Sequence, residues 1–340
     1  MKRLSRNHWA RHGNGHICVA LGVLILALCV HAEAQQPAKI PKIGFLNAGF
    51  GSASGIPWRE PLQRELQKLG YIDGKNVAFI YRYADTKYDR LPVLAQELVR
   101  LKVDLIITPG VNDTRAAKNA TQTIPIVFTG AGSDPVTLGL VDSLARPGRN
   151  VTGFAQIAST LAGKKLELLK ETVPKLSRVA VLWDPQNAGS VQIWEESQRR
   201  AKELGIVLYA LKINGADTFE SGLKQAVKAG SGALLGTSGA LIGSLRTQII
   251  NLATKNRLPA IYPRAIWAVN GGLMSYGPDE IEPFQQSARM VDKILKGANP
   301  ADLPVEQPTK FDLIINLKTA KQIGLTIPQI VLARADRVIK

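Results

Sequence analysis

Histidine and cysteine are nearly absent from this chain of 340 residues, which has four histidines and two cysteines. All six lie close to the N-terminus: His8, His12, His16, His31, Cys18 and Cys29. The rest of the chain therefore has no Ser-His-Asp or Cys-His centre, no imidazole or thiolate metal ligand and no disulfide. Because general acid–base catalysis near neutral pH most often uses histidine, this composition favours a binding protein over an enzyme.

Long hydrophobic runs are equally scarce, and the one at residues 17–30 is shorter than the roughly 20 residues of a bilayer span. Four basic residues precede it: Lys2, Arg3, Arg6 and Arg11. Residues 32–34 (AEA) follow with the small-x-small pattern of a cleavage site. We therefore predict that residues 1–34 are a signal peptide cleaved near Ala34, and that the protein is periplasmic. An uncleaved anchor is the alternative, and Leu28 before Cys29 disfavours lipidation.

Acidic residues are fewer than basic ones, 27 against 43, so the formal net charge is +16. Cleavage would lower it to +13, because four basic residues and Glu33 would be removed. Attraction to an anionic envelope surface is one interpretation. We favour a generically basic, solvated surface and expect no nucleic-acid partner, because no aromatic-basic motif is present. With 45% apolar and 21% charged residues, the composition is typical of a soluble globular protein, and the length indicates two domains.

Apolar strands alternate with amphipathic helices, a pattern typical of a parallel sheet covered on both faces. Strands are predicted at residues 43–47, 77–83, 104–108, 125–129, 178–183, 206–212, 233–236 and 259–262. Helices are predicted at residues 58–69, 90–101, 191–204, 218–229, 241–256 and 280–296, between 108 and 125, and from Asp134-Pro135 as N-cap and first helical residue. Residues 280–340 hold too few strands for a third domain, so they must complete the other two.

The two halves repeat the same order of segments. Residues 43–46, 69–70 and 124–127 correspond to residues 179–182, 204–205 and 258–261, at nearly equal offsets. We predict two doubly wound parallel-sheet lobes of the α/β class, although chance echoes are the alternative. Ligands of open α/β sheets bind beyond the carboxyl ends of the strands, which would place a site between the lobes.

Small residues follow three strands of the first half, where they would let a ligand approach the backbone. These candidate ligand-binding residues are Gly49, Phe50, Pro109, Gly110, Val111, Gly132, Ser133 and Asp134. The helix N-termini behind such loops favour an anionic group. An ordinary tight turn is the alternative for each loop.

Ten segments together carry a family resemblance. They are residues 42–46 (KIGFL), 69–71, 74–77, 88–92 (YDRLP), 102–106, 124–128, 134–135, 146–153 (RPGRNVTG), 271–277 (GGLMSYG) and 311–320 (FDLIINLKTA). In these segments the chain resembles the substrate-binding proteins of ABC importers, and in particular the family whose better-known members take aromatic amino acids.

The resemblance implies a type I periplasmic-binding-protein fold with hinge crossings near residues 154–159, 276–280 and 305–310. It implies one lobe of residues 40–155 and 280–305, and a second of residues 156–279 and 306–330. The implied partners are a small-molecule solute and an inner-membrane ABC permease. We expect a monomer without cofactor or metal.

Carried over by position, the family's sites give Ser133, Asp134, Phe154, Trp183, Tyr262 and Arg264, and we add Ser238 and Tyr276 at neighbouring strand ends. The rings of Phe154, Trp183 and Tyr262 could stack on a planar ligand, with core packing as the alternative. Arg264 favours a carboxylate, with a surface salt bridge as the alternative. Many members have an aspartate for a ligand amine where this chain reads GTS (residues 236–238), which argues against an amino acid.

We therefore predict a receptor, not an enzyme, that captures a small aromatic or carboxylated solute by hinge closure. A sensor protein of the same fold is the first alternative. The second is a secreted carboxylate-dependent hydrolase, which would need paired acids such as Asp134 and Asp184.

Overall fold

The computed structural model describes residues 40–50, 59–131, 134–155, 160–279 and 281–340. The predicted signal peptide lies outside these ranges, and so do Gly132, Ser133 and the part of the first predicted hinge crossing at residues 156–159.

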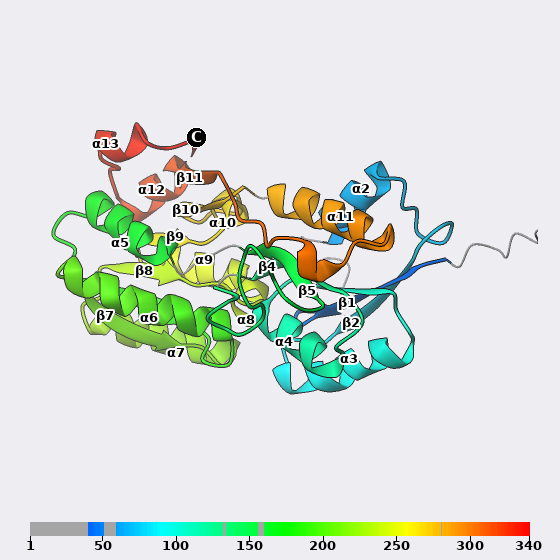
Figure 1. Ribbon diagram of the computed structural model, residues 1–340. Coiled ribbons are helices and arrows are strands. Elements are labelled where there is room, and N and C mark those ends of the chain that lie inside the picture. The colour runs from blue at the N-terminus through cyan, green and yellow to red at the C-terminus, as the bar shows by residue number, and fades with distance from the viewer. Residues whose placement is uncertain (1–39, 51–58, 132–133, 156–159, 280) are drawn as a thin grey trace, which may run out of the picture. The chain divides into compact units, whose positions relative to one another are not determined.

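The first lobe is built on a five-stranded sheet in the order β2-β1-β3-β4-β5, and every pair in it is parallel (Figure 1). Its strands are β1 (Lys42–Asn47), β2 (Ala78–Tyr83), β3 (Leu105–Thr108), β4 (Ile126–Ala131) and β5 (Val151–Ala155). Strands β3 and β5 are buried throughout and β1 is buried after its first residue, because helices cover both faces of the sheet.

The second lobe is built on a seven-stranded sheet in the order β12-β11-β10-β9-β8-β6-β7. Its strands are β6 (Arg178–Trp183), β7 (Val207–Lys212), β8 (Ala233–Gly236), β9 (Ala260–Tyr262), β10 (Met274–Pro278), β11 (Phe311–Asn316) and β12 (Arg337–Ile339). All pairs are parallel except β10 with β11. The prediction of an α/β protein with two parallel-sheet lobes is confirmed.

Twelve α-helices lie in the described part of the chain. They are α2 (Arg59–Lys68), α3 (Leu91–Arg100), α4 (Val111–Ala120), α5 (Leu161–Thr172), α6 (Ala188–Glu203), α7 (Ala216–Lys228), α8 (Ala240–Ser244), α9 (Arg246–Lys255), α10 (Ala265–Val269), α11 (Glu282–Leu295), α12 (Leu317–Ile323) and α13 (Gln329–Leu332). Within the described ranges, no helix combines the length and the apolar character that a membrane span requires.

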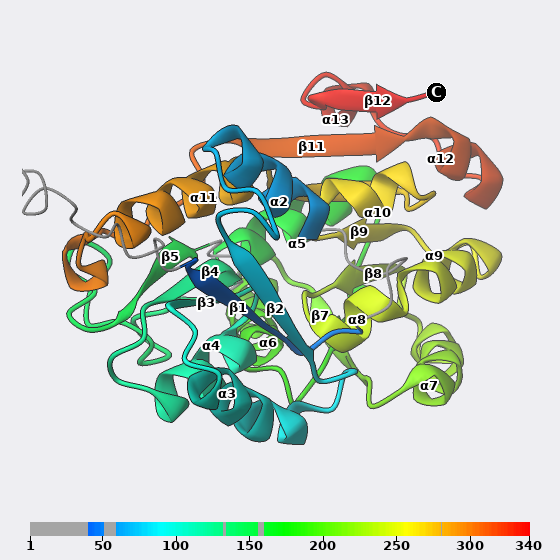
Figure 2. The same ribbon diagram turned by 90° about the vertical axis from the view of Figure 1, so that its right-hand side faces the viewer.

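Each sheet has an apolar layer on both faces. In the first lobe, α2 and α11 cover one face around Phe45, whereas α3 and α4 cover the other around Phe128. Figure 2 shows α11, although it comes late in the chain, beside α2. In the second lobe, α5 packs over the layer that contains Val181, and α7 and α9 pack over the layer that contains Leu182.

The chain segments that pass between the sheets are hydrogen-bonded to one another. The amide of Glu306 donates to the carbonyl of Gly153 at 3.0 Å, and the amide of Ala155 donates to the carbonyl of Glu306 at 2.8 Å. The amide of Asp279 donates to the carbonyl of Lys310 at 3.4 Å. The connecting segments are therefore joined by direct backbone hydrogen bonds.

Two helix predictions are wrong. Residues after Asp134 form turns instead of a helix: the Asp134 carboxylate accepts from the Val136 amide at 3.0 Å and the Thr137 hydroxyl at 2.5 Å, and Gly139 then adopts a positive φ of 65°. The helix predicted at residues 241–256 is two helices, α8 and α9, because Leu245 leaves helical geometry with φ −95° and ψ 9°.

Candidate ligand-binding site

Asp113 ties together two strand-end loops of the first lobe. Its side chain lies in the first turn of α4 and is fully buried, and one carboxylate oxygen accepts from the Ala48 amide at 2.7 Å. Burial raises the pKa of this carboxyl group to about 7, although the N–H groups of Ala48 and Gly110 act in the opposite direction. The loop after β1, which includes Gly49, is thereby fixed to the loop between β3 and α4.

Hydrogen bonds join the strand-end loops of the two lobes. The Tyr88 hydroxyl donates to a carboxylate oxygen of Asp184 at 2.9 Å. Burial and the Asp184 carboxylate both raise the pKa of the Tyr88 hydroxyl, so it stays protonated and remains the donor. The Asn112 side-chain amide donates to the carbonyl of Gln186 at 2.8 Å. These contacts place Tyr88, which follows β2, and the first turn of α4 against the start of α6.

Asp134, one of the predicted ligand-binding residues, also contacts the second lobe. Its backbone N–H donates to the side-chain oxygen of Gln192 on α6 at 3.1 Å. The carboxylate of Asp134 accepts hydrogen bonds from the turn that follows. The contact of Asp134 with the second lobe is therefore made by its backbone N–H group and not by its side chain.

The second lobe presents a buried polar cluster at the N-terminus of α6. Asp184 directly follows β6 and is 1% exposed, and its backbone N–H donates to the Ser190 hydroxyl at 2.9 Å. The Ser190 and Thr237 hydroxyls are 2.7 Å apart, which joins the end of β6 to the end of β8. Asn187 caps the helix by accepting from the Ser190 amide at 2.8 Å.

Trp183, the last residue of β6, has an unused hydrogen-bond donor. Its ring stacks on Trp194 at 5.4 Å between centroids, and the Lys212 ammonium lies 5.7 Å from the ring centre. The side chain is 9% exposed, and its indole Nε1 has no hydrogen-bond partner within the described residues. A buried N–H without an acceptor is costly, so this position suits a ligand that supplies one.

The other predicted ligand residues differ in how deeply they are buried. Phe154 is fully buried, and Tyr262 is buried and stacks on Trp267 at 4.7 Å between ring centroids. Arg264 is half-buried where α10 begins. Tyr276 and Ser238 are half-buried, and Phe50 is exposed. Of the first-lobe loop residues, Val111 is buried, whereas Pro109 and Gly110 are half-buried.

Three residues were missed by sequence reasoning: Tyr88, Asp113 and Lys165. An acidic residue in the first turn of a helix is an ordinary N-terminal signal, so Asp113 gave only a weak hint. Lys165 on α5 is 1% exposed, and burial lowers the pKa of its ammonium to about 8. It is preceded by Lys164, a half-buried residue that pairs with Glu167, and no sequence pattern separates the two lysines.

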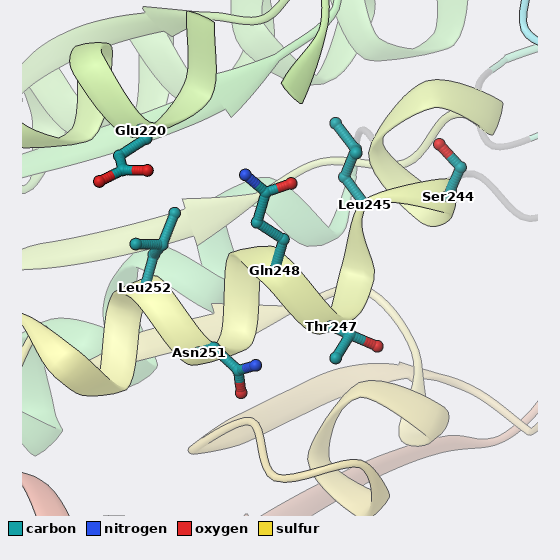
Figure 3. Close-up of a pocket in the computed structure, with 7 residues that line it drawn as sticks. All are labelled: Glu220, Ser244, Leu245, Thr247, Gln248, Asn251 and Leu252. Atoms are coloured by element: carbon teal, nitrogen blue, oxygen red, sulfur yellow. The ribbon is translucent and has the colours of Figure 1, made fainter. Parts of the chain in front are cut away.

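A separate pocket of about 510 Å³ lies on the second lobe, where Glu220 of α7 faces residues of α8 and α9 (Figure 3). None of the predicted ligand-binding residues lines it. In the described part of the chain, no three His, Cys, Asp or Glu side chains come close enough to hold a metal ion.

Two parallel-sheet lobes whose strand-end loops meet define a two-lobed ligand-binding protein of the type I periplasmic class. The family model described as "ABC transporter substrate binding protein" matches residues 56–339. The chain therefore belongs to this family, as its sequence motifs predicted.

Known proteins are similar to this chain along most of its length. A tyrosine-binding protein of Clostridioides difficile is 28% identical over 266 residues, which are 77% of this chain and 75% of the relative. A conserved domain protein of Vibrio cholerae superimposes with a TM-score of 0.81 at 29% identity, over 88% of this chain and 100% of that one. The ABC domain of a Streptococcus pneumoniae protein in complex with L-Trp has a TM-score of 0.80 at 24% identity, over 88% and 99%.

Proposed function

We propose that this protein is the periplasmic receptor of an ABC importer and captures a small aromatic or carboxylated solute between its lobes. The observation that carries the proposal is the meeting of strand-end loops from both lobes, with Tyr88 bonded to Asp184 beside the unpartnered indole of Trp183. Contacts that form only when the lobes meet favour the closed arrangement, and a ligand that touches both lobes adds to them.

The solute class follows from the groups at the strand ends. The relatives that carry the names of tyrosine and tryptophan support an aromatic ligand. Residues 236–238 (GTS) provide no carboxylate after β8, and the Asp184 carboxylate is already held by the Tyr88 hydroxyl and the Gln186 amide. The site thus has an aromatic surface and hydrogen-bond donors, whereas it has no free carboxylate after β8 that could pair with an amine.

Export, partner and oligomeric state complete the proposal. The N-terminal pattern supports cleavage near Ala34 and release into the periplasm, and the family supports docking on an inner-membrane permease. The receptor would act as a monomer and would need no cofactor. A sensor of the same fold is the alternative. A hydrolase is disfavoured because the carboxylates of Asp134 and Asp184 are both occupied by local hydrogen bonds.

Ligand-dependent stabilisation tests the function. The full chain, exported by its own leader and purified without denaturant, would be heated with a panel of aromatic acids, aromatic amino acids and small carboxylates. A compound present at a thousand times its Kd adds about 4 kcal/mol to the unfolding free energy, so we expect a clear rise in Tm for one class of compound. No rise with any compound, together with consumption of one of them, would contradict a receptor and favour the hydrolase.

The bond between Tyr88 and Asp184 gives a second test. Tyr88→Phe removes a hydrogen bond to a charged acceptor that bridges the lobes, so we expect the affinity for the compound found above to fall about tenfold. Tyr81→Phe is the matched control, because the Tyr81 hydroxyl bonds to Gln63 within the first lobe. Equal affinity of the two variants in calorimetry would show that this contact plays no part in closure.

A further inference from the structure

Lys165 is a buried cation without a counter-charge in the described part of the chain. Its side chain is 1% exposed on a helix face that otherwise buries Leu166 and Leu169. Nearby acids on α5 are committed elsewhere: Glu167 pairs with Lys164 at 3.0 Å, and Glu171 pairs with Arg334. Because buried charges in proteins are normally paired, an isolated ammonium calls for an anion from outside.

The helix places this ammonium at the ligand-facing end of the sheet. At the other end of α5, the Thr172 hydroxyl contacts the Met274 sulfur at 3.6 Å, where β10 begins. Lys165 lies two turns earlier, which is about 10 Å along the helix or about three residues along a strand. Side chains on a helix also lean toward its N-terminus. The ammonium therefore lies level with the last residues of β10, and α5 also contacts β8 and β9.

The same apolar layer holds the aromatic residues of the candidate site. Val179 and Val181 of β6 pack with Leu166 of α5, and strand alternation puts Trp183 on that face. Tyr276 of β10 packs against this layer as well. One end of the layer thus combines a cation, the unpartnered indole N–H of Trp183 and two aromatic rings.

A carboxylate satisfies both donors at once, because it accepts from an ammonium and from an N–H group. A ligand ammonium close to Lys165 would instead meet a like charge, which in a low-dielectric site is strongly unfavourable. The Asp184 carboxylate, which directly follows Trp183, already accepts hydrogen bonds from the Tyr88 hydroxyl and the Gln186 amide. The chemistry of this end of the second lobe therefore fits an aromatic acid that has no amine.

We propose that Lys165 binds the carboxylate of the solute, with Trp183 as a second donor, and that the receptor selects aromatic carboxylates over aromatic amino acids and amines. The proposal rests on the proposed receptor function and names its ligand class. It also assigns Lys165 as the residue that determines specificity for the anion.

Three related probes test the selection by isothermal titration calorimetry on the processed protein. The probes are 4-hydroxyphenylacetate, which has only the carboxylate, tyramine, which has only the amine, and L-tyrosine, which has both. We expect the wild-type protein to bind 4-hydroxyphenylacetate most tightly and tyramine not at all. Preference for tyramine or for L-tyrosine would overturn the inference but leave the receptor function intact.

Two lysine variants then test the residue. Lys165→Met keeps the length of the side chain without its charge, and we expect at least a hundredfold loss of affinity for 4-hydroxyphenylacetate. Lys164→Met is the matched control on the neighbouring lysine, which pairs with Glu167 and is only half-buried, and we expect a change of less than twofold. Unchanged affinity of a Lys165→Met protein whose cooperative melting transition shows that it is folded would overturn the role of Lys165. Failure of the wild-type protein to bind any aromatic or carboxylated compound would overturn the receptor function itself.

Discussion

Replacement of Gly153 by alanine is expected to destabilise the protein by about 3 kcal/mol or more. Gly153 lies in β5 opposite Phe128 of β4, with φ +155°. A Cβ atom there would overlap the Phe128 carbonyl oxygen and lie 2.7 Å from its backbone nitrogen. Backbone atoms on a paired strand cannot move aside as a flexible side chain can, so β4 and β5 would have to separate.

Gly205→Ala is the matched control for this effect. Gly205 also has a positive φ, +64°, but open space surrounds the position of its missing Cβ. We therefore expect only the usual cost of a left-handed alanine, about 1 kcal/mol. Urea unfolding of both variants gives the comparison. Equal midpoints would show that the close approach to Phe128 carries no energetic weight.

The second large effect concerns pH and Asp113. Burial raises the pKa of its carboxyl group from the ordinary 3.8 to about 7, so between these two pH values the folded state binds the proton that the unfolded chain has lost. This contribution to stability is fully present below about pH 4 and is lost as the pH rises through 7. We expect unfolding to cost about 3 kcal/mol more at pH 5 than at pH 8 because of this one group.

Asp113→Asn should remove most of that pH dependence. The asparagine keeps an acceptor for the Ala48 amide but cannot titrate, so its Tm should change little between pH 5 and pH 8. Burial and neighbouring carboxylates, Asp113 among them, raise the pKa of Tyr88, so its hydroxyl stays protonated over this pH range. Asp217→Asn, an exposed change on α7, is the control and should retain the wild-type slope. Calorimetric melts at four pH values give the dependence of Tm on pH for each variant. A dependence in Asp113→Asn as steep as in the wild-type protein would contradict the role of Asp113.

The strands were the most predictable part of the fold. The predicted ranges 178–183 and 233–236 coincide with β6 and β8, because an inner parallel strand is an unbroken apolar run. The predicted helix ends near Gly70 and Gly205 are close to the observed ones, and both glycines have a positive φ. The two wrong helix predictions have local causes. An aspartate side chain can accept hydrogen bonds from the backbone of a turn as well as cap a helix, and at Asp134 it does the former. The break between α8 and α9 at Leu245 has no proline that would have indicated it in the sequence.

The candidate site was less predictable because its residues act through distant partners. Asp113 matters through Ala48, which is 65 positions away, and Tyr88 through Asp184, which is 96 positions away. Lys165 is preceded by another lysine on a charged helix, and only the tertiary packing shows which of the two is buried. The aromatic residues at the strand ends could be identified from the sequence. The sequence does not tell which ring is free to stack on a ligand and which, like that of Tyr262 on Trp267, stacks on another residue.

The packing of α11 on the first lobe has a consequence for the order of folding. Val291 of this helix completes the apolar layer around Phe45, and the Tyr71 hydroxyl bonds to Asp292, 221 positions later in the chain. One face of the first sheet thus stays uncovered until nearly the whole chain is available, and closing so long a loop is slow. The N-terminal lobe therefore cannot finish folding until α11 is available, and α11 follows β6 to β10 of the second lobe in the chain.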